Sequence, residues 1–197
     1  MELEALIFDV GNVLLTYDPE ELRAVYAGRY QDYSHLPIGY VNWPQLELYV
    51  RGRVTTAEFV RHLEGLTKRR IDPEGFDSAW SAVFHVNERL VQLIPALRRK
   101  YKLAILSNTI DSHWRCCKEK LAPIIDYFDV VVLSFEVNLL KPEPEIFLKT
   151  AALLGQPPER CLLIDDTQGH VLAARAAGFP AICYKEQETE SFLLSLL

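Results

Sequence analysis

Carboxylate, hydroxyl and ammonium side chains occur in this chain at the points where short apolar runs end. The four segments are IFDVGNVL at 7–14, ILSNT at 105–109, LKPEP at 140–144 and LIDDT at 163–167. Together they provide a carboxylate nucleophile, a hydroxyl group, an ammonium group and a pair of carboxylates. This combination can carry out phosphoryl transfer, because a carboxylate that attacks an anionic phosphate needs hydrogen-bond donors and positive charge beside it.

Asp9 is the candidate nucleophile. A carboxylate that attacks phosphorus forms an aspartyl-phosphate and divides hydrolysis into two easier steps. Because both reactants are anionic, we expect Mg²⁺ to be held by a few carboxylates, water and the substrate phosphate. Asp165 and Asp166 are the expected carriers, since adjacent carboxylates repel each other without a cation. The alternative for Asp166 is a cap of the helix that starts near Thr167.

Lys141, Ser107 and Asn108 are candidates for binding the phosphate group. Pro142 and Pro144 restrict the backbone beside Lys141, whose ammonium group can neutralise phosphate charge. Ser107 and Asn108 can donate hydrogen bonds to phosphate oxygens. Alternatively, Lys141 is a solvated loop residue, and Ser107 and Asn108 form a turn that ends a strand.

Continuous apolar runs predict buried strands at 5–10, 101–106, 130–133, 161–164 and 181–184. Helical patterns occur at 87–100 with a kink at Pro95, and at 111–121, 145–154, 167–177 and 188–197. Alternating strands and helices indicate right-handed crossovers and a parallel sheet, so the fold class is α/β. Because ligands bind outside the carboxyl ends of such strands, Asp9, Ser107 and the pair Asp165 and Asp166 are expected to meet there.

The segment between the first two core strands is much longer than one crossover requires. It is rich in aromatic residues and has helix signals at 19–29, 44–50, 55–66 and 73–83, with a capping box from Thr55 to Glu58. We therefore expect a helical cap over residues 17–85, seated on the carboxyl edge of a core made of residues 1–16 and 86–197. The cap residues form no motif that identifies a substrate.

The composition argues against several classes of protein. The chain has 197 residues and a net charge of -6 at pH 7, without the basic face of a nucleic-acid-binding protein. No apolar run approaches the roughly 20 residues that span a bilayer. Glu2 and Glu4 lead directly into a strand, so we expect no signal peptide. The four cysteines form no Cys-x-x-Cys pair, and reduced thiols suit a cytoplasmic enzyme.

The four segments, in this order, resemble the motifs of the haloacid dehalogenase superfamily, and the resemblance covers nearly the whole chain. Asp9 matches the nucleophile of that family, Ser107 the second-motif hydroxyl residue, Lys141 the third-motif lysine, and Asp165 with Asp166 the acidic fourth motif. The resemblance implies a Rossmann-like core with strand order 5-4-1-2-3 and a helical C1 cap. It also implies a Mg²⁺-dependent phosphatase that acts on a small phosphate ester.

In this family the backbone carbonyl two residues after the nucleophile also binds Mg²⁺. The matching position is Gly11, so the resemblance implies a metal site made by Asp9, Gly11, Asp165 and Asp166. We also expect Gly11 and Asn12 to lie against the substrate phosphate.

The phrase Phe-Asp-x-Gly-Asn-Val is similar to a branch of sugar-phosphate phosphatases of the alpha-D-glucose-1-phosphate phosphatase type. Asp18 and His113 match an acidic residue and a histidine of that type, which implies that they contact the substrate. The alternatives are an aspartate that starts a helix before Pro19 and a surface histidine on the helix at 111–121.

The sequence leaves open whether the protein is a monomer or a homodimer.

Position 11 departs from most phosphatases of the family, which have a second aspartate there as general acid and base. Gly11 cannot transfer a proton, and such a group typically contributes 10²–10⁴-fold to the rate. Either the substrate has a leaving group that needs little protonation, or Asp18, His113 or a cap residue supplies the proton, or the protein only binds a phosphometabolite. A metal-free haloacid dehalogenase is a further alternative, disfavoured by the paired acids Asp165 and Asp166.

Overall fold

The computed structural model describes residues 2–18, 20–21, 24, 44–68, 70–72 and 83–197. Its strands are β1 (Ala5–Phe8), β2 (Leu15–Thr16), β3 (His85–Val86), β4 (Lys102–Ser107), β5 (Val130–Leu133), β6 (Cys161–Asp165) and β7 (Ala181–Cys183). Its helices are α2 (Pro44–Val50), α3 (Thr56–Thr67), α5 (Glu88–Val91), α6 (Ile94–Leu97), α7 (Asp111–Lys120), α8 (Ser134–Val137), α9 (Pro144–Leu154), α10 (Gln168–Ala176) and α11 (Glu186–Ser195), with short 3₁₀ turns at Ile125–Tyr127 and Pro158–Arg160. The predicted helices at 19–29 and 73–83 fall largely outside these described residues.

The described core strands form a five-stranded parallel sheet in the order β5-β4-β1-β6-β7. If the five core strands are numbered 1 to 5 in chain order, the sheet read from β7 to β5 has the order 5-4-1-2-3, as predicted. Phe8 of the central strand β1 pairs with Ile105 of β4 on one side and with Ile164 of β6 on the other. The three strands therefore end at the same edge of the sheet. The predicted strands are confirmed, and their ends differ from the prediction by two residues or fewer.

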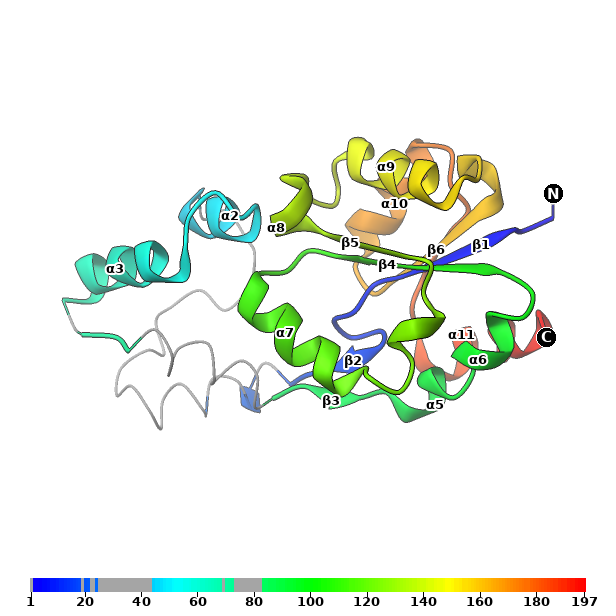
Figure 1. The fold of residues 1–197 in the computed structure, drawn as a ribbon, viewed down its shortest axis with the longest axis horizontal. Helices are drawn as coiled ribbons and strands as arrows, with labels where there is room; N and C mark the ends of the chain where they lie inside the picture. The colour runs from blue at the N-terminus through cyan, green and yellow to red at the C-terminus, as the bar shows by residue number, and fades with distance from the viewer. Residues whose placement is uncertain (1, 19, 22–23, 25–43, 69, 73–82) are drawn as a thin grey trace.

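Helices cover both faces of the sheet (Figure 1). Helices α9 and α10 lie on one face, and α5, α6, α7 and α11 lie on the other, while α2 and α3 lie beyond the carboxyl ends of the strands. Both faces of a parallel sheet are buried in this arrangement, which explains why its strands read as continuous apolar runs.

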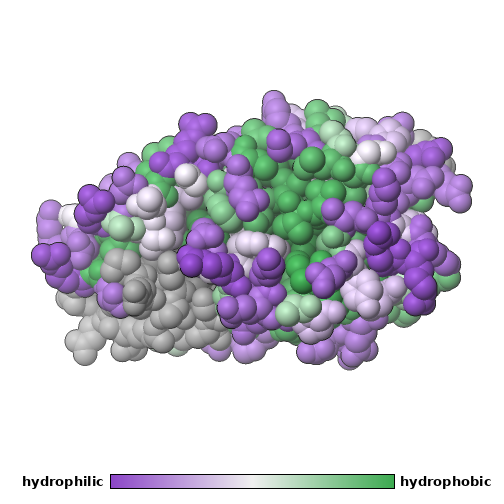
Figure 2. Space-filling model, in the orientation of Figure 1, coloured by the Kyte–Doolittle hydropathy of each residue, from purple (hydrophilic) through white to green (hydrophobic). Residues whose placement is uncertain are grey.

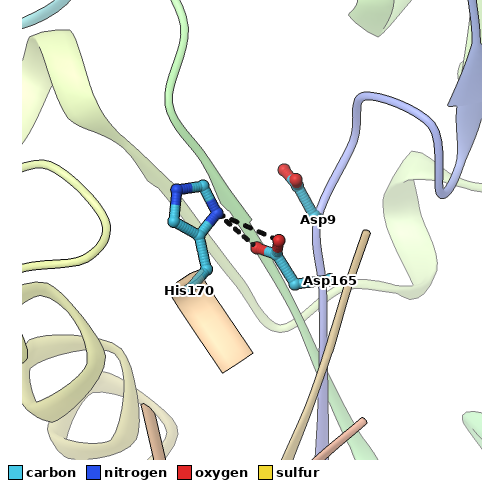
Figure 3. A group of neighbouring side chains, drawn as sticks. All are labelled: Asp9, Asp165 and His170. Atoms are coloured by element: carbon cyan, nitrogen blue, oxygen red, sulfur yellow. Dashed lines mark hydrogen bonds and ion pairs between the residues drawn. The ribbon is translucent and has the colours of Figure 1, made fainter. Parts of the chain in front are cut away.

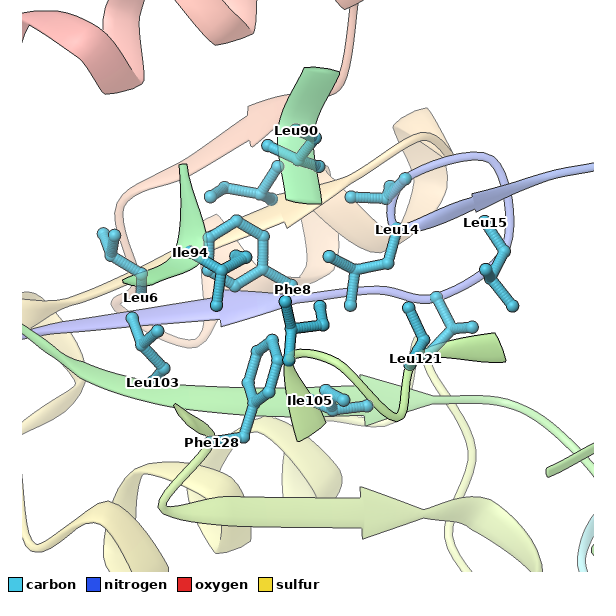
Figure 4. Packing of buried hydrophobic residues seen from close by; sticks show 14 of the residues in the cluster. Leu6, Phe8, Leu14, Leu15, Leu90, Ile94, Leu103, Ile105, Leu121 and Phe128 are labelled. Atoms are coloured by element: carbon cyan, nitrogen blue, oxygen red, sulfur yellow. The ribbon is translucent and has the colours of Figure 1, made fainter. Parts of the chain in front are cut away.

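Strand β1 shows how the sequence builds this core. Successive side chains of a strand point to opposite faces, so Leu6 and Phe8 join one apolar cluster, while Ala5 and Ile7 join the other. Figure 4 shows the first cluster, where the ring of Phe8 meets Phe128 edge to face with centroids 6.1 Å apart. The strand that carries the candidate nucleophile is therefore held firmly on both sides.

The single kinked helix predicted at 87–100 is wrong, since two short helices occupy the segment. Helix α5 ends at Val91, and α6 begins at Ile94 with Pro95 in its first turn. Pro95 has no N–H to donate to the carbonyl of Val91, and its ring clashes with that carbonyl in a continuous helix, which favours a break there. The other predicted core helices, at 111–121, 145–154, 167–177 and 188–197, are confirmed to within two residues at each end.

Helices α2 and α3 pack on each other outside the sheet. The rings of Tyr49 and Phe59 stack with centroids 4.5 Å apart, within an apolar cluster that also contains Ile110 from the loop after β4. The predicted capping box is present, because the Thr55 hydroxyl accepts from the backbone N–H of Glu58, and the Glu58 carboxylate accepts from that of Thr55. Strands β2 and β3 form a short antiparallel pair in which Leu15 lies opposite Val86. The sequence patterns do not predict this pair.

The surface is mostly polar on the face shown in Figure 2, with hydrophobic residues gathered in the middle, where edge strand β5 lies. Val130 and Val131 of this strand are half-buried. Among the described helices, none combines the length and the apolar character that crossing a membrane would require.

Truncating Phe147 should test the packing of α9 on the sheet. Phe147 is completely buried and lies against Phe179, with ring centroids 6.1 Å apart. We expect Phe147→Ala to lower the free energy of unfolding by about 3–5 kcal/mol in chemical denaturation, because it leaves a cavity. The matched control is Leu148→Ala, since Leu148 is 45% exposed, and its effect should stay within about 0.5 kcal/mol. Equal effects of the two substitutions would contradict this packing.

Candidate active site

Three candidate residues meet at the carboxyl edge of the sheet because they end neighbouring parallel strands. Asp9 directly follows β1, Ser107 is the last residue of β4, and Asp165 is the last residue of β6. The backbone N–H of Asp9 donates to the carbonyl of Ile164 at 3.0 Å, which fixes the end of β1 against β6. Asp9 and Ser107 are buried and line a cavity of about 750 Å³ between this edge and α2.

Lys141 joins the two carboxylates. Its Nζ lies 2.9 Å from Asp9 Oδ1 and 2.6 Å from Asp165 Oδ2, and only 3% of the residue is exposed. Burial alone would lower the pKa of Lys141, but the charges of Asp9 and Asp165 outweigh burial, and the pKa is raised. The side chain therefore keeps its positive charge, and it is not the solvated loop lysine of the alternative interpretation.

Asn108 positions Lys141 through the backbone. The Asn108 side-chain Nδ2 donates to the Lys141 carbonyl at 2.8 Å, and the Lys141 N–H donates to Asn108 Oδ1 at 2.9 Å. This reciprocal pair joins the end of β4 to the loop that precedes α9. The amide of Asn108, which the sequence suggests as a phosphate donor, is engaged in holding the lysine in this structure.

Asp165 is fully buried and anionic. Its carboxylate accepts from the Lys141 ammonium group and from the backbone N–H of Thr167 at 2.9 Å, and His170 Nδ1 lies 3.0 and 3.2 Å from its two oxygens (Figure 3). Burial alone would raise the pKa of Asp165, but Lys141 and His170 outweigh burial and hold the pKa well below its usual range.

His170 is a site residue that sequence reasoning misses. It lies in the first turn of α10, the helix that follows β6, and it lines the cavity. The N-terminal end of a helix that follows a parallel strand lies at the carboxyl edge of the sheet, where ligands bind. A histidine five residues after Asp165 was therefore a signal in the sequence, although no motif identifies it.

Asp9 has a raised pKa of about 6, because it is buried and lies near Asp165, while Lys141 acts in the opposite direction. The backbone N–H of Val10 donates to Asp9 Oδ1 at 2.7 Å and also favours the anion. A cation bound beside Asp9 would favour the anion further, and the anion is the form that can act as a nucleophile.

The donor atoms at this edge fit a divalent cation. Asp9, Asp165 and His170 each offer one possible ligand atom, and these three atoms lie within 4.8 Å of one another. Among the described residues, this is the group of histidine, cysteine and acidic side chains that could hold a metal ion. Asp9 and Asp165 belong to the predicted metal site. The third predicted carboxylate, Asp166, is not in the group.

Asp166 lies beside Asn12. Its carboxylate accepts from Asn12 Nδ2 and from the Thr167 hydroxyl, each at 3.2 Å, and both Asp166 and Asn12 line the cavity. Asn12 has a φ of 53°, in the left-handed region that asparagine tolerates, and its Oδ1 accepts from the backbone N–H of Tyr17 at 3.4 Å. Gly11 also lines the cavity, next to these residues.

Comparison with known proteins identifies the family. A family model of haloacid dehalogenase-like hydrolases matches residues 3–178. The chain belongs to this family. The hydrolase shares 27% of its residues with D-ribitol-5-phosphate phosphatase of Bacteroides thetaiotaomicron over 189 residues, which cover 90% of the hydrolase and 89% of that relative. It is also 27% identical over 201 residues to a pyrimidine 5'-nucleotidase of Escherichia coli, with 93% and 86% covered.

Solved structures agree with this assignment. A mutant of a family enzyme from Bacteroides thetaiotaomicron, in complex with magnesium and inorganic phosphate, matches the hydrolase with a TM-score of 0.88 and 26% identity over 98% of each chain. L-2-haloacid dehalogenase from Xanthobacter autotrophicus has the same fold, with a TM-score of 0.66 at 20% identity over 98% of the hydrolase and 82% of that chain. The matches support a phosphoric monoester hydrolase. The narrower resemblance to glucose-1-phosphate phosphatases stays a prediction.

Asp18 lies apart from the cavity of the hydrolase. It is exposed, its Oδ1 accepts from the backbone N–H of Glu20 at 2.8 Å, and it is not among the described residues that line the cavity. This arrangement matches the alternative interpretation, in which the aspartate starts a helix.

His113 lines the cavity but is buried, and it is not the surface histidine of the alternative interpretation. Its ring lies against Phe84 with centroids 6.3 Å apart, and burial lowers its pKa to about 3. The imidazole is neutral at physiological pH, so it does not act as a cationic proton donor in this arrangement.

The side of the cavity opposite the sheet is formed by α2 and the residue that follows it. The carbonyl of Val50 accepts from the buried Ser134 hydroxyl at 2.8 Å, and Arg51 Nη1 donates to Glu143 Oε2 at 3.1 Å. The second Arg51 nitrogen, Nη2, contacts Glu143 Oε1. Since Glu143 follows Lys141 by two residues, α2 is tied to the loop that carries the ammonium group.

The lowered pKa of His113 makes stability depend on pH. Between pH 6.5 and about 3, the His113 ring binds a proton in the unfolded chain but not in the folded chain. The free energy of unfolding therefore falls as the pH is lowered through this range. On going from pH 7 to pH 5, we expect the free energy of unfolding of His113→Gln to fall by about 1–2 kcal/mol less than that of the wild type, as measured by urea denaturation. NMR should show a neutral His113 ring throughout this range, and a ring that titrates there would contradict the burial.

Proposed function

We propose that the hydrolase is a Mg²⁺-dependent phosphatase that hydrolyses a small phosphorylated metabolite, with a sugar phosphate as the expected substrate. The observation that carries this proposal is the arrangement of Asp9, Lys141 and Asp165 at the carboxyl edge of the sheet. It combines a nucleophile, a fixed cation and a second buried carboxylate beside a cavity of about 750 Å³, which is large enough for a sugar phosphate.

In the proposed reaction, an oxygen of Asp9 attacks phosphorus while the bond from phosphorus to the leaving oxygen breaks. Water then attacks the aspartyl-phosphate, which releases inorganic phosphate and regenerates Asp9. Lys141 neutralises part of the negative charge, and the Ser107 hydroxyl can donate to a phosphate oxygen. Asp9, Asp165, Asp166 and the carbonyl of Gly11 would hold Mg²⁺, which when bound supplies further positive charge at the transferred phosphoryl group.

Residues 17–85 are proposed to form the cap that selects the substrate. Glu47 and Arg51 line the cavity on this side and, with Tyr17, are polar groups that a sugar could contact. We further propose a cytoplasmic location, supported by four free cysteines, and a monomer or homodimer.

Replacing Asp9 tests the nucleophile. Asp9→Asn should lower kcat for para-nitrophenyl phosphate in the presence of Mg²⁺ by at least about 10³-fold, because only binding and electrostatic effects remain. Asp126→Asn is the matched control. Asp126 is exposed in the short 3₁₀ turn at Ile125–Tyr127 and lies outside the site. Removal of Mg²⁺ with a chelator should abolish the wild-type activity. Activity of Asp9→Asn within a factor of ten of the wild type would reject the mechanism.

Gly11 leads to a specific proposal about the leaving group. Without an acid at position 11, the hydrolase should favour anomeric, acyl or aryl phosphates, and the rate should depend steeply on the pKa of the leaving group. The backbone at position 11 accepts a side-chain Cβ, because a Cβ at Gly11 would meet Tyr17 Cε1 at 3.7 Å, an ordinary contact, as its nearest neighbour.

Gly11→Asp should therefore raise kcat on alkyl phosphates by about 10²–10⁴-fold and flatten the dependence on leaving-group pKa. Gly11→Ala is the control that removes the glycine without adding an acid, and it should leave the steep dependence unchanged. A flat dependence in the wild type would mean that another group already supplies the proton.

A further inference from the structure

We propose that Glu47, Arg51 and Glu143 select phosphate esters whose organic part is uncharged and carries hydroxyl groups, and reject esters that carry a second acidic group. This inference rests on the proposed function and names the substrate class of the same site. The three residues are called the acidic wall below, since they combine two carboxylates with one guanidinium group. They line the same cavity as Asp9, the proposed nucleophile.

The guanidinium group of Arg51 could bind a second acid, but it is already engaged. Nε donates to Glu47 Oε1 at 3.0 Å, and Nη1 donates to Glu143 Oε2 and to the Asn138 carbonyl, each at 3.1 Å. Nη2 contacts Glu143 Oε1 and lies 2.9 Å from Glu47 Oε1. All three nitrogens have acceptors, and only 15% of the side chain is exposed. A substrate carboxylate would have to displace these charge-assisted contacts.

The other basic side chains that line the cavity do not supply a cation for a distant acid. Lys141 lies between Asp9 and Asp165, so its charge belongs to the reacting end of the cavity. His170 lies beside Asp165 at the same end. The buried ring of His113 is neutral. Among the described residues that line the cavity, none is therefore a cation that is available to the organic part of a substrate.

The acidic wall has one net negative charge and one accessible acceptor. Both Glu143 oxygens are occupied, since Oε2 also accepts from the N–H of Leu140 at 2.9 Å. Glu47 Oε2 has no hydrogen-bond partner within the described part of the chain, and this side chain is 57% exposed. A substrate hydroxyl can donate to that oxygen, whereas a carboxylate or a second phosphate would be repelled by the net charge.

Apolar parts of the cavity suit the same class of ligand. Leu46, Val50 and Phe84 line it, and the ring of Phe84 meets Tyr17 edge to face with centroids 5.9 Å apart. A second charged group would lose hydration against these side chains without gaining a partner. A sugar can pack its C–H groups on them while its hydroxyl groups reach polar residues of the lining.

Binding to the Asp9→Asn variant tests this selection without turnover. Calorimetry in the presence of Mg²⁺ should compare two pairs of esters in which a carboxylate replaces a CH₂OH group. The pairs are α-D-glucose 1-phosphate with α-D-glucuronate 1-phosphate, and glycerol 3-phosphate with 3-phosphoglycerate. We expect the ester without the carboxylate to bind at least about 10-fold more tightly in each pair. Equal binding within a pair, or no binding of any of the esters, would overturn the inference.

Neutralising Glu47 in the same Asp9→Asn background tests the assigned residue. Glu47→Gln should narrow the difference within each pair to about 3-fold or less, because it removes one charge and keeps an oxygen that can accept from Arg51. The matched control is Glu159→Gln, which should retain the full difference. Glu159 is exposed in the turn at Pro158–Arg160, at the amino end of β6, and lies outside the cavity lining. An unchanged difference in Glu47→Gln would contradict the role of the acidic wall.

These outcomes are separate from that of the phosphatase assay. An active phosphatase that binds the acid-bearing esters more tightly would contradict this inference alone. A protein that binds the esters with the expected preference but does not hydrolyse them would contradict the proposed function alone.

Discussion

Lys141 shares one ammonium group between Asp9 and Asp165, and the site is organised around this balance of charge. Two buried carboxylates and one ammonium group leave one net negative charge before any substrate arrives. A phosphate ester adds more negative charge in a place with little water. Burying uncompensated charge is costly, so the site requires a further cation. The charges explain why the pKa of Lys141 is raised and that of Asp165 is lowered, whereas burial, together with the charge of Asp165, raises the pKa of Asp9.

This balance depends on parts of the chain that are far apart in sequence. Parallel pairing of β1 with β4 and β6 brings Asp9, Ser107 and Asp165 to one edge, while Lys141 enters from a loop. A loop residue is usually less well fixed than a strand residue. Here the two hydrogen bonds between Asn108 and the backbone of Lys141 give the loop a partner at the end of β4.

The sheet order and the convergence of the motif residues could be predicted because they follow from apolar runs and from the geometry of parallel sheets. Periodicity and capping signals also located α2 and α3 closely. Pro95 was predicted to bend a helix rather than divide it, since a pattern of apolar residues does not reveal a missing hydrogen bond. His170 and the burial of His113 escaped prediction because both depend on the direction in which a helix presents its first turns to the sheet.

Glu143 has a consequence for how the two sides of the cavity communicate. One of its oxygens accepts from the N–H of Leu140, and both contact Arg51 just after α2. The loop that carries Lys141 is thereby fastened at one end to the sheet and at the other to α2. Any displacement of α2 would therefore have to break the contacts between Arg51 and Glu143 or carry with it the loop that holds the ammonium group of Lys141.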